Sequence, residues 1–232
     1  MQSDVTPGLR GTPKSTVFIV DDHPIVRQGL ALLINREPDL AVCGDAEEAV
    51  SALTRIAQLN PDLVIVDISL NGPDGLDLLK DIRVREPHLP VLVLSMLDES
   101  LYAERALRAG AKGYIMKQEA TERVLVAIRR ILAGDIYVSE QMSSRMLHRF
   151  VGGNQVEQQS PISELTDREL EVFRLIGEGH GTRQIAEELH ISVKTVESYQ
   201  AHIKVKLSLK NARELVQRAI QWTAADKSNR AS

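Results

Sequence analysis

Leu63-Val64-Ile65-Val66-Asp67 is the stretch that decides the fold, because four consecutive apolar residues end at a single aspartate. An uninterrupted apolar run of this length is typical of a strand that is buried on both faces. Similar short runs lie at residues 16–20, 40–44, 91–95 and 113–116. Strands of this kind belong to parallel sheets, whose two faces are covered by helices.

Helical patterns alternate with these runs. They lie near residues 24–36, 46–59, 75–86, 99–110 and 119–134. Five strand–helix units in succession predict an α/β fold: a five-stranded, doubly wound parallel sheet of the flavodoxin-like kind. Such sheets bind ligands outside the carboxyl ends of their strands, so that edge is where a functional site is expected.

A second region of the chain is helical throughout. A stretch rich in Gly, Gln, Ser and Pro follows a helical segment at 139–151, and no strand pattern appears after it. Thr166 and Glu169 have the spacing of a capping box, which marks the start of a helix. Helices are also expected at 182–189, 193–208 and 211–223. The predicted all-α domain therefore has four helices with a helix-turn-helix arrangement.

The predicted division of the chain has five parts. Residues 1–15 form a flexible leader, 16–135 the α/β domain, 136–162 a helical linker and flexible connection, 163–226 the helical domain, and 227–232 a tail.

Composition excludes several classes of protein. Of 232 residues, 43% are hydrophobic and 26% charged, which is ordinary for a globular protein. The single cysteine, Cys43, excludes an internal disulfide and a Cys-rich metal site. No run of 18 apolar residues indicates a membrane span, and the first 15 residues lack the apolar stretch of a signal peptide. We therefore expect a cytoplasmic protein without a membrane partner.

Three carboxylates follow two strands that should be neighbours. Asp21 and Asp22 directly follow the first strand, and Asp67 directly follows the third. Carboxylates that converge repel one another unless a cation joins them, and hard oxygen ligands suit Mg²⁺. For each aspartate alone, a solvated position at the start of a loop is the favoured interpretation.

Two more polar residues favour the functional interpretation. Ser95 ends the fourth strand, and Lys117 follows the fifth. An ammonium group and a hydroxyl beside a carboxylate–metal site fit phosphoryl transfer, because they neutralise and hydrogen-bond the phosphoryl oxygens.

This series of residues resembles the receiver domain of response regulators, over about residues 15–135. The resemblance implies that Asp67 is the phospho-acceptor and that Lys117 pairs with a phosphoryl oxygen. It implies that Mg²⁺ is held by Asp21, Asp22, Asp67 and the backbone carbonyl of Ser69.

The resemblance also implies a conformational switch. Ser95 would be the switch hydroxyl and Tyr114 the switch aromatic, with the helix 4–strand 5–helix 5 face as the surface that changes. The chain departs from the family at Asn71, where a proline usually stands four residues after the acceptor. This puts the conformation of the loop and the rate of phosphorylation in doubt. The implied catalysis is limited to the domain's own phosphorylation and slow dephosphorylation, so no enzyme with external turnover is expected.

The helical domain resembles the LuxR-type DNA-binding domain over about residues 163–225. The motifs that carry this resemblance are Leu165-Thr166-Asp167-Arg168-Glu169-Leu170, Ile185-Ala186-Glu187-Glu188-Leu189 and Ile191-Ser192-Val193-Lys194-Thr195-Val196-Glu197-Ser198-Tyr199. A receiver joined to such a domain indicates a NarL/FixJ-type transcription factor that binds promoter DNA. Residues 192–218 hold six basic and two acidic residues, a modest electrostatic signal for DNA.

The second helix of the motif provides the expected DNA contacts. Val193, Val196, Ile203 and Leu207 form its expected inner stripe. The outer face presents the DNA-binding candidates Lys194, Thr195, Glu197, Ser198, His202, Lys204 and Lys206. By analogy with the family, the last helix would form a dimer contact through Leu215, Ala219 and Trp222. Burial of those three side chains inside the monomer is the competing interpretation.

Partners follow from the resemblance. They are promoter half-sites, a sensor histidine kinase, a second copy of the phosphorylated chain and, as a further candidate, RNA polymerase. Two rival functions remain. A haloacid-dehalogenase-type phosphatase would carry its nucleophile after the first strand with a second aspartate two residues on, whereas here the two aspartates are adjacent. The other rival is a partner-exchange module that no longer binds DNA. Judged by the helix count alone, a helical interaction module would explain the last four helices equally well.

Overall fold

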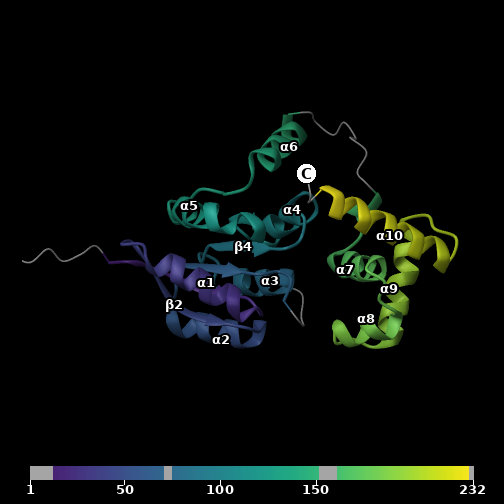
Figure 1. The fold of residues 1–232 in the computed structure, drawn as a ribbon, viewed down its shortest axis with the longest axis horizontal. Helices are drawn as coiled ribbons and strands as arrows, with labels where there is room; N and C mark the ends of the chain where they lie inside the picture. The colour runs from purple at the N-terminus through teal and green to yellow at the C-terminus, as the bar shows by residue number, and fades with distance from the viewer. Residues whose placement is uncertain (1–12, 71–74, 152–160, 230–232) are drawn as a thin grey trace, which may run out of the picture.

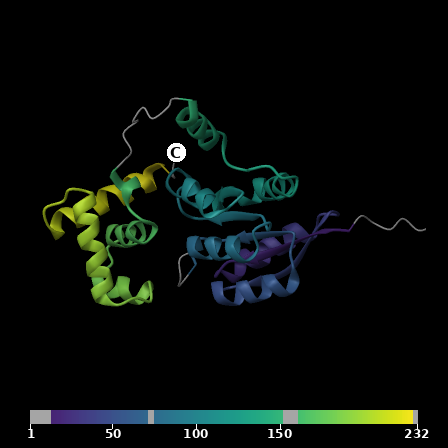
Figure 2. The ribbon, with the colours of Figure 1, turned by 180° about the vertical axis from the view of Figure 1, so that it is seen from behind.

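A computed structural model describes residues 13–70, 75–151 and 161–229. It contains an α/β domain followed by a helical domain, which lies to one side of the sheet in both views (Figures 1 and 2). The five strands are β1 (Ser15–Val20), β2 (Leu40–Ala46), β3 (Leu63–Val66), β4 (Val91–Ser95) and β5 (Gly113–Met116). All pair in parallel in the order β2-β1-β3-β4-β5. The predicted doubly wound sheet is therefore confirmed.

Helices cover both faces of this sheet. They are α1 (Pro24–Asn35), α2 (Ala49–Leu59), α3 (Gly75–Arg85), α4 (Glu99–Ala109) and α5 (Ala120–Leu132). Buried side chains of α1 and α5 share one apolar cluster with one face of the sheet, and those of α2, α3 and α4 share another with the opposite face. Strands flanked in this way need apolar side chains in both directions, and all four residues of β3 are buried.

The free edge of β5 is covered by the chain that follows α5. Tyr137 forms a parallel bridge with Gly113, and its carbonyl accepts a hydrogen bond from the Tyr114 N–H (2.9 Å). Helix α6 (Glu140–Val151) comes next, and the Ser139 N–H at its start donates to Glu99 of α4 (3.0 Å). The linker therefore pairs with β5 and also touches α4, contacts that the sequence did not predict.

The helical domain has four helices after a short 3₁₀ turn at Pro161–Glu164. They are α7 (Asp167–Gly177), α8 (Thr182–Glu188), α9 (Val193–Lys206) and α10 (Ala212–Asn229). The predicted capping box begins α7: Thr166 accepts from the Glu169 N–H, and Glu169 accepts from the Thr166 N–H. Within the described residues, no helix combines the length and the apolar character that crossing a membrane requires.

Three of the four residues expected in the inner stripe of α9 face inward. Val196 and Ile203 are fully buried and Leu207 is partly buried, but Val193 is 39% exposed. The expectation for Val193 is wrong because this residue is the first of the helix, directly after the Ser192 cap, and borders an open hollow beside α8. The division into five parts remains a prediction, and residues 1–12 and 152–160 lie outside the described residues.

A close helix contact in the second domain is open to test. A Cβ added at Gly177 would lie 2.5 Å from the carbonyl oxygen of Ala219 in α10. Gly177→Ala should therefore destabilise the domain by about 1–3 kcal/mol, because helix α10 must shift. The measurement is urea unfolding followed by the fluorescence of Trp222, the only tryptophan, which packs on Phe173 with ring centroids 5.5 Å apart.

Gly29→Ala is the matched control, because a Cβ there meets nothing within 4 Å. It lies in α1 of the other domain and should leave the Trp222 transition unchanged. An unaltered urea midpoint for Gly177→Ala would show that α7 and α10 are not packed this closely.

Candidate functional site

Side chains that follow different strands meet at the carboxyl edge of the sheet. Asp67 follows β3 and is 1% exposed, and Asp21 follows β1 and is 2% exposed. Lys117, which follows β5, places its Nζ 2.6 Å from Oδ2 of Asp67 and 2.8 Å from Oδ2 of Asp21. These three residues, predicted from strand order alone, do lie together.

At both Asp67 and Lys117, burial and the neighbouring opposite charge shift the pKa in opposite directions. Burial raises the pKa of Asp67, and the nearby Asp21 charge adds to this, while Lys117 and the Ser69 N–H limit the rise. Burial alone would lower the pKa of Lys117, but the two carboxylates raise it above its usual value. The ammonium is therefore held in its charged form, where it partly neutralises a negative cluster.

The same edge suits a divalent cation. One ligand atom from each of Asp21, Asp22, His23 and Asp67 lies within 4.8 Å of the others. The carboxylate oxygens of Asp21, Asp22 and Asp67 fit the preference of Mg²⁺ for hard oxygen ligands. The site residues therefore fit the metal that the receiver resemblance implies.

His23 also belongs to this cluster. Its Nδ1 lies 2.6 Å from Oδ1 of Asp22 and 3.3 Å from Oδ1 of Asp21. The side chain is 61% exposed, so it borders the site from the solvent side.

Arg27 of α1 holds the loop that carries Asp21 and Asp22 in place. Its Nη1 donates to the Asp21 carbonyl (2.5 Å) and its Nε to Asp45 at the end of β2 (2.9 Å). The side chain is only 14% exposed. Sequence reasoning missed this residue, because Arg27 lies on α1 and its partner Asp45 on β2, and only the folded domain brings the two together.

A chain of hydrogen bonds leads away from Asp67. Its Oδ1 accepts from the Ser69 N–H (2.8 Å), and the Ser69 hydroxyl lies 2.9 Å from that of Ser95. Ser95 accepts from the Leu97 N–H (3.2 Å), and the buried Tyr114 hydroxyl donates to the Leu97 carbonyl (2.8 Å). The two expected switch residues therefore meet at Leu97, two residues before α4. The departure at Asn71 lies outside the described residues.

The proposed DNA-reading face of α9 is open. Lys194, Glu197, Ser198 and His202 are exposed, while Thr195 and Lys204 are half-buried. Ser192 caps the helix by accepting from the Thr195 N–H (3.0 Å). The first turn of α9 therefore presents a cation and N–H groups together, an arrangement that favours phosphate.

Lys206 has a different environment from the other lysines of α9. Its Nζ lies 2.6 Å from Glu169, the capping-box residue of α7, whose side chain is 4% exposed. Burial alone would raise the pKa of Glu169, but Lys206 and the Thr166 cap hold it below its usual value. The Lys206 ammonium therefore ties the end of α9 to the start of α7.

For two residues of α10, the structure decides between a dimer contact and burial inside the monomer. Leu215 and Ala219 are 2% and 0% exposed and pack inside the domain, and Trp222 is partly buried beside Phe173. The exposed large apolar residues of this helix are Val216 and Ile220, on its other face. The competing expectation, burial within the monomer, therefore describes Leu215 and Ala219.

Removing the support of the acidic loop should weaken metal binding. Arg27→Gln is expected to lower the affinity for Mg²⁺ by about tenfold, because the Asp21–His23 loop loses its link to Asp45. Isothermal titration with Mg²⁺ measures this, and Arg27→Lys should recover part of the loss. Arg55→Gln is the control, because Arg55 also reaches the end of β2 but contacts the Asp45 carbonyl and the Phe18 ring. Equal Mg²⁺ affinities for all four proteins would contradict the role of Arg27.

Both halves of the chain match known families. Residues 17–129 match the response regulator receiver domain, and residues 163–219 match the bacterial regulatory proteins of the luxR family. Among curated proteins, the oxygen regulatory protein NreC of Staphylococcus epidermidis is 36% identical over 210 residues, which cover 88% of this chain and 96% of that protein. NreC of Staphylococcus aureus is 36% identical over 209 residues, with the same coverage.

Solved structures agree with these matches. RcsB from Salmonella enterica serovar Typhimurium, bound to the promoter rprA in the presence of phosphomimetic BeF3−, is 28% identical with a TM-score of 0.63, over 88% of this chain and 97% of that one. A LuxR-family two-component response regulator from Aurantimonas sp. is 34% identical with a TM-score of 0.55, over 60% of this chain and 99% of that one. The chain belongs to the NarL/FixJ-type two-component response regulators, transcription regulators that join a receiver domain to a LuxR-type DNA-binding domain.

Proposed function

We propose that a partner histidine kinase phosphorylates Asp67, and that this modification promotes dimerisation and promoter binding. The observation that carries the proposal is the buried Asp67 carboxylate with Lys117 at 2.6 Å and a second carboxylate, Asp21, on the same ammonium. A nucleophile, a cation and a metal-binding group are then present within one small space.

The transfer needs little covalent chemistry from the protein. A carboxylate oxygen of Asp67 attacks phosphorus as the N–P bond of the donor phosphohistidine breaks, and the electron pair stays on the imidazole nitrogen. Lys117 shifts from the Asp67 carboxylate to a phosphoryl oxygen and neutralises its charge. The Ser69 N–H, which already donates to Oδ1, holds the carboxylate in its orientation. Bound Mg²⁺ would supply further charge neutralisation, held by Asp21, Asp22, Asp67 and the Ser69 carbonyl.

Ser95 and Tyr114 then convey the change. The phosphoryl group adds about two negative charges and strong acceptor oxygens beside Asp67. The fully buried Ser95 hydroxyl at the end of β4, which now contacts the Ser69 hydroxyl and the Leu97 N–H, is the donor for a phosphoryl oxygen. Its movement displaces Leu97 and with it the hydrogen bond from Tyr114.

DNA is contacted by the first turn and outer face of α9. RcsB is described as two dimers bound to two parallel DNAs. We propose a dimer on paired half-sites for this chain as well, with the exposed Val216 and Ile220 of α10 in place of the buried Leu215 and Ala219 as its contact in the DNA-binding domain. The protein acts in the cytoplasm on promoter DNA, has no substrate other than its own phosphoryl donor, and brings its bound promoter to RNA polymerase.

Loss of the acceptor should abolish phosphorylation. With acetyl phosphate and Mg²⁺, the wild-type chain should gain the mass of one phosphoryl group in intact-protein mass spectrometry, and Asp67→Ala should gain none. Asp135→Ala is the control, because that carboxylate is 59% exposed and lies beyond β5 with Arg130. Persistent labelling of Asp67→Ala would overturn the assignment of the acceptor.

Lys194 and Lys206 of α9 should have different roles, the first in DNA binding and the second in the stability of the domain. Lys194→Ala should weaken binding to a random-sequence duplex and reduce the logarithmic salt slope by about 1, because one phosphate contact is lost. Lys206→Met should instead leave the slope unchanged and lower the stability of the domain by about 1–3 kcal/mol, because buried Glu169 loses its cation. Fluorescence anisotropy and Trp222 unfolding measure the two effects. The assignment fails if Lys206→Met changes the salt slope and Lys194→Ala does not.

A further inference from the structure

The ring of His23 faces the acidic cluster, although most of the side chain is exposed. Its Nδ1 lies 2.6 Å from Oδ1 of Asp22 and 3.3 Å from Oδ1 of Asp21, and the side chain is 61% exposed. The residue stands at the N-cap position of α1, but its side chain forms no capping hydrogen bond. The ring is therefore paired with the two carboxylates and not with the helix that it precedes.

The loop that carries these three side chains is held in place. The His23 N–H donates to Oδ1 of Asp21 (2.8 Å), and Arg27 donates to the Asp21 carbonyl. Pro24 begins α1, and its fixed φ restricts the backbone directly after His23. Three consecutive residues can therefore offer ligand atoms to one point without a large rearrangement.

The spacing of these ligand atoms fits coordination of one cation. Zn²⁺ binds imidazole nitrogen and carboxylate oxygen at about 2.0–2.2 Å, so two such ligands stand about 3 Å apart. The separations of 2.6 and 3.3 Å from His23 to Asp22 and Asp21 lie on either side of that value. Asp67 completes the group, because one ligand atom from each of the four residues lies within 4.8 Å of the others.

A mixed set of oxygen and nitrogen ligands discriminates between cations. Mg²⁺ prefers oxygen ligands, keeps several waters and gains little from an imidazole. Zn²⁺ combines imidazole with carboxylates, so an added ring nitrogen favours Zn²⁺ over Mg²⁺. In the part of the chain that the structure describes, no other group of three or more His, Cys, Asp and Glu side chains is arranged in this way. Selectivity between cations is therefore decided at this cluster.

We propose that His23 makes the acidic cluster selective for a transition-metal cation of the Zn²⁺ class, which binds Nδ1 together with the carboxylates of the cluster. The cation takes the place of the proton that the ring and Asp22 share, and that proton is released to solvent. Because the same carboxylates would hold Mg²⁺, the two cations compete, and Zn²⁺ antagonises Mg²⁺-dependent phosphorylation. The inference rests on the proposed function only for this last consequence.

Isothermal titration of the full-length chain with Zn²⁺, and separately with Mg²⁺, tests the selectivity. His23→Gln keeps a side chain that can hydrogen-bond to Asp22 but has no ring nitrogen. It should lower the Zn²⁺ affinity by at least about tenfold, because even residues that only orient a ligand contribute that much. Its Mg²⁺ affinity should stay within about twofold of wild type. An unchanged Zn²⁺ affinity would overturn the proposal, and so would an equal loss for both cations, which would mean that His23 only holds the loop.

His180→Gln is the matched control. Nδ1 of His180 lies 2.8 Å from Oε2 of Glu188 in the other domain, but among the described residues no third ligand joins this pair. The Zn²⁺ affinity of this variant should equal that of wild type. A loss as large as that of His23→Gln would mean that any His–carboxylate pair accounts for the binding, which would contradict a site at the cluster.

Competition and X-ray absorption locate the bound cation. Excess Mg²⁺ should displace Zn²⁺ from the wild-type chain, and independent binding of the two cations would contradict a shared site. With one equivalent of Zn²⁺, absorption at the zinc edge should show one imidazole nitrogen among oxygen ligands at about 2.0–2.2 Å in wild type, and oxygens alone in His23→Gln. A wild-type spectrum without imidazole would overturn the role of His23.

Phosphorylation is measured apart from metal binding. With acetyl phosphate and Mg²⁺, added Zn²⁺ should reduce the phosphoryl mass gained by wild type more than that gained by His23→Gln. Equal inhibition of the two proteins would contradict antagonism through His23. If wild type gains no mass even without Zn²⁺, the proposed phosphorylation fails, whereas the titrations still decide the selectivity of the cluster.

Discussion

The burial of like charges at one edge of the sheet is the constraint on which this structure depends. Asp21 and Asp67 are almost fully buried, and β1 and β3 are neighbours, so their carboxylates are forced together. Two buried carboxylates are unfavourable without a cation, and Lys117 supplies one from the end of β5. The same excess of negative charge suits a divalent cation, and it is the charge balance that the proposed phosphorylation would change.

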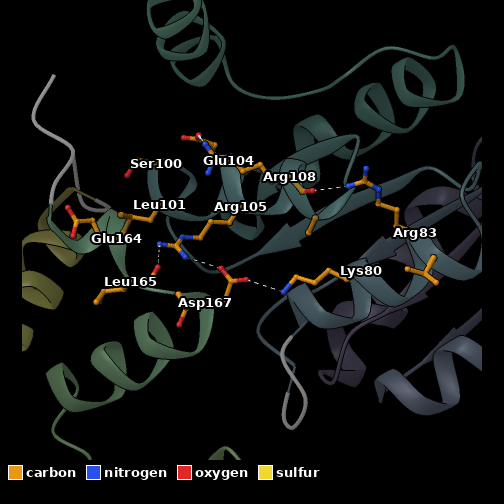
Figure 3. Close-up of a pocket in the computed structure, with 13 residues that line it drawn as sticks. Lys80, Arg83, Ser100, Leu101, Glu104, Arg105, Arg108, Glu164, Leu165 and Asp167 are labelled. Atoms are coloured by element: carbon orange, nitrogen blue, oxygen red, sulfur yellow. Dashed lines mark hydrogen bonds and ion pairs between the residues drawn. The ribbon is translucent and has the colours of Figure 1, made fainter. Parts of the chain in front are cut away.

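Short, specific contacts connect the acidic cluster to the second domain. Asp67, Ser69 and Ser95 are joined by hydrogen bonds, and Ser95 is joined to the start of α4 through Leu97. Helix α4 also receives the linker, through Glu99, and α7, through Arg105, which Figure 3 shows beside Asp167. It is therefore the element on which the site, the linker and the DNA-binding domain converge. A few polar contacts of this kind can exchange with little cost, as a switch requires.

Much of the fold and of the acidic site could be predicted from the sequence. In a parallel sheet, strand order alone puts the residues after each strand at one edge, which is why Asp21, Asp67, Ser95 and Lys117 were found in advance. Contacts set by tertiary docking carry no such periodic signal. Arg27 of α1 reaches Asp45 of β2, and Arg105 of α4 reaches the other domain. On α10 the pattern identified apolar positions, but it did not reveal which of them the domain itself buries.

Amide chemical shifts of the full-length chain, before and after Mg²⁺ and beryllofluoride, test the central claim most directly. The account predicts a continuous set of changes from Asp67 through Ser95, Leu97 and Arg105 to Asp167. Solvent accessibility of the Glu197 amide at the start of α9 should be the same in both states. Changes confined to the acidic edge, with Arg105 and Asp167 unmoved, would contradict the claim that the buried charge cluster controls the DNA-binding domain through α4.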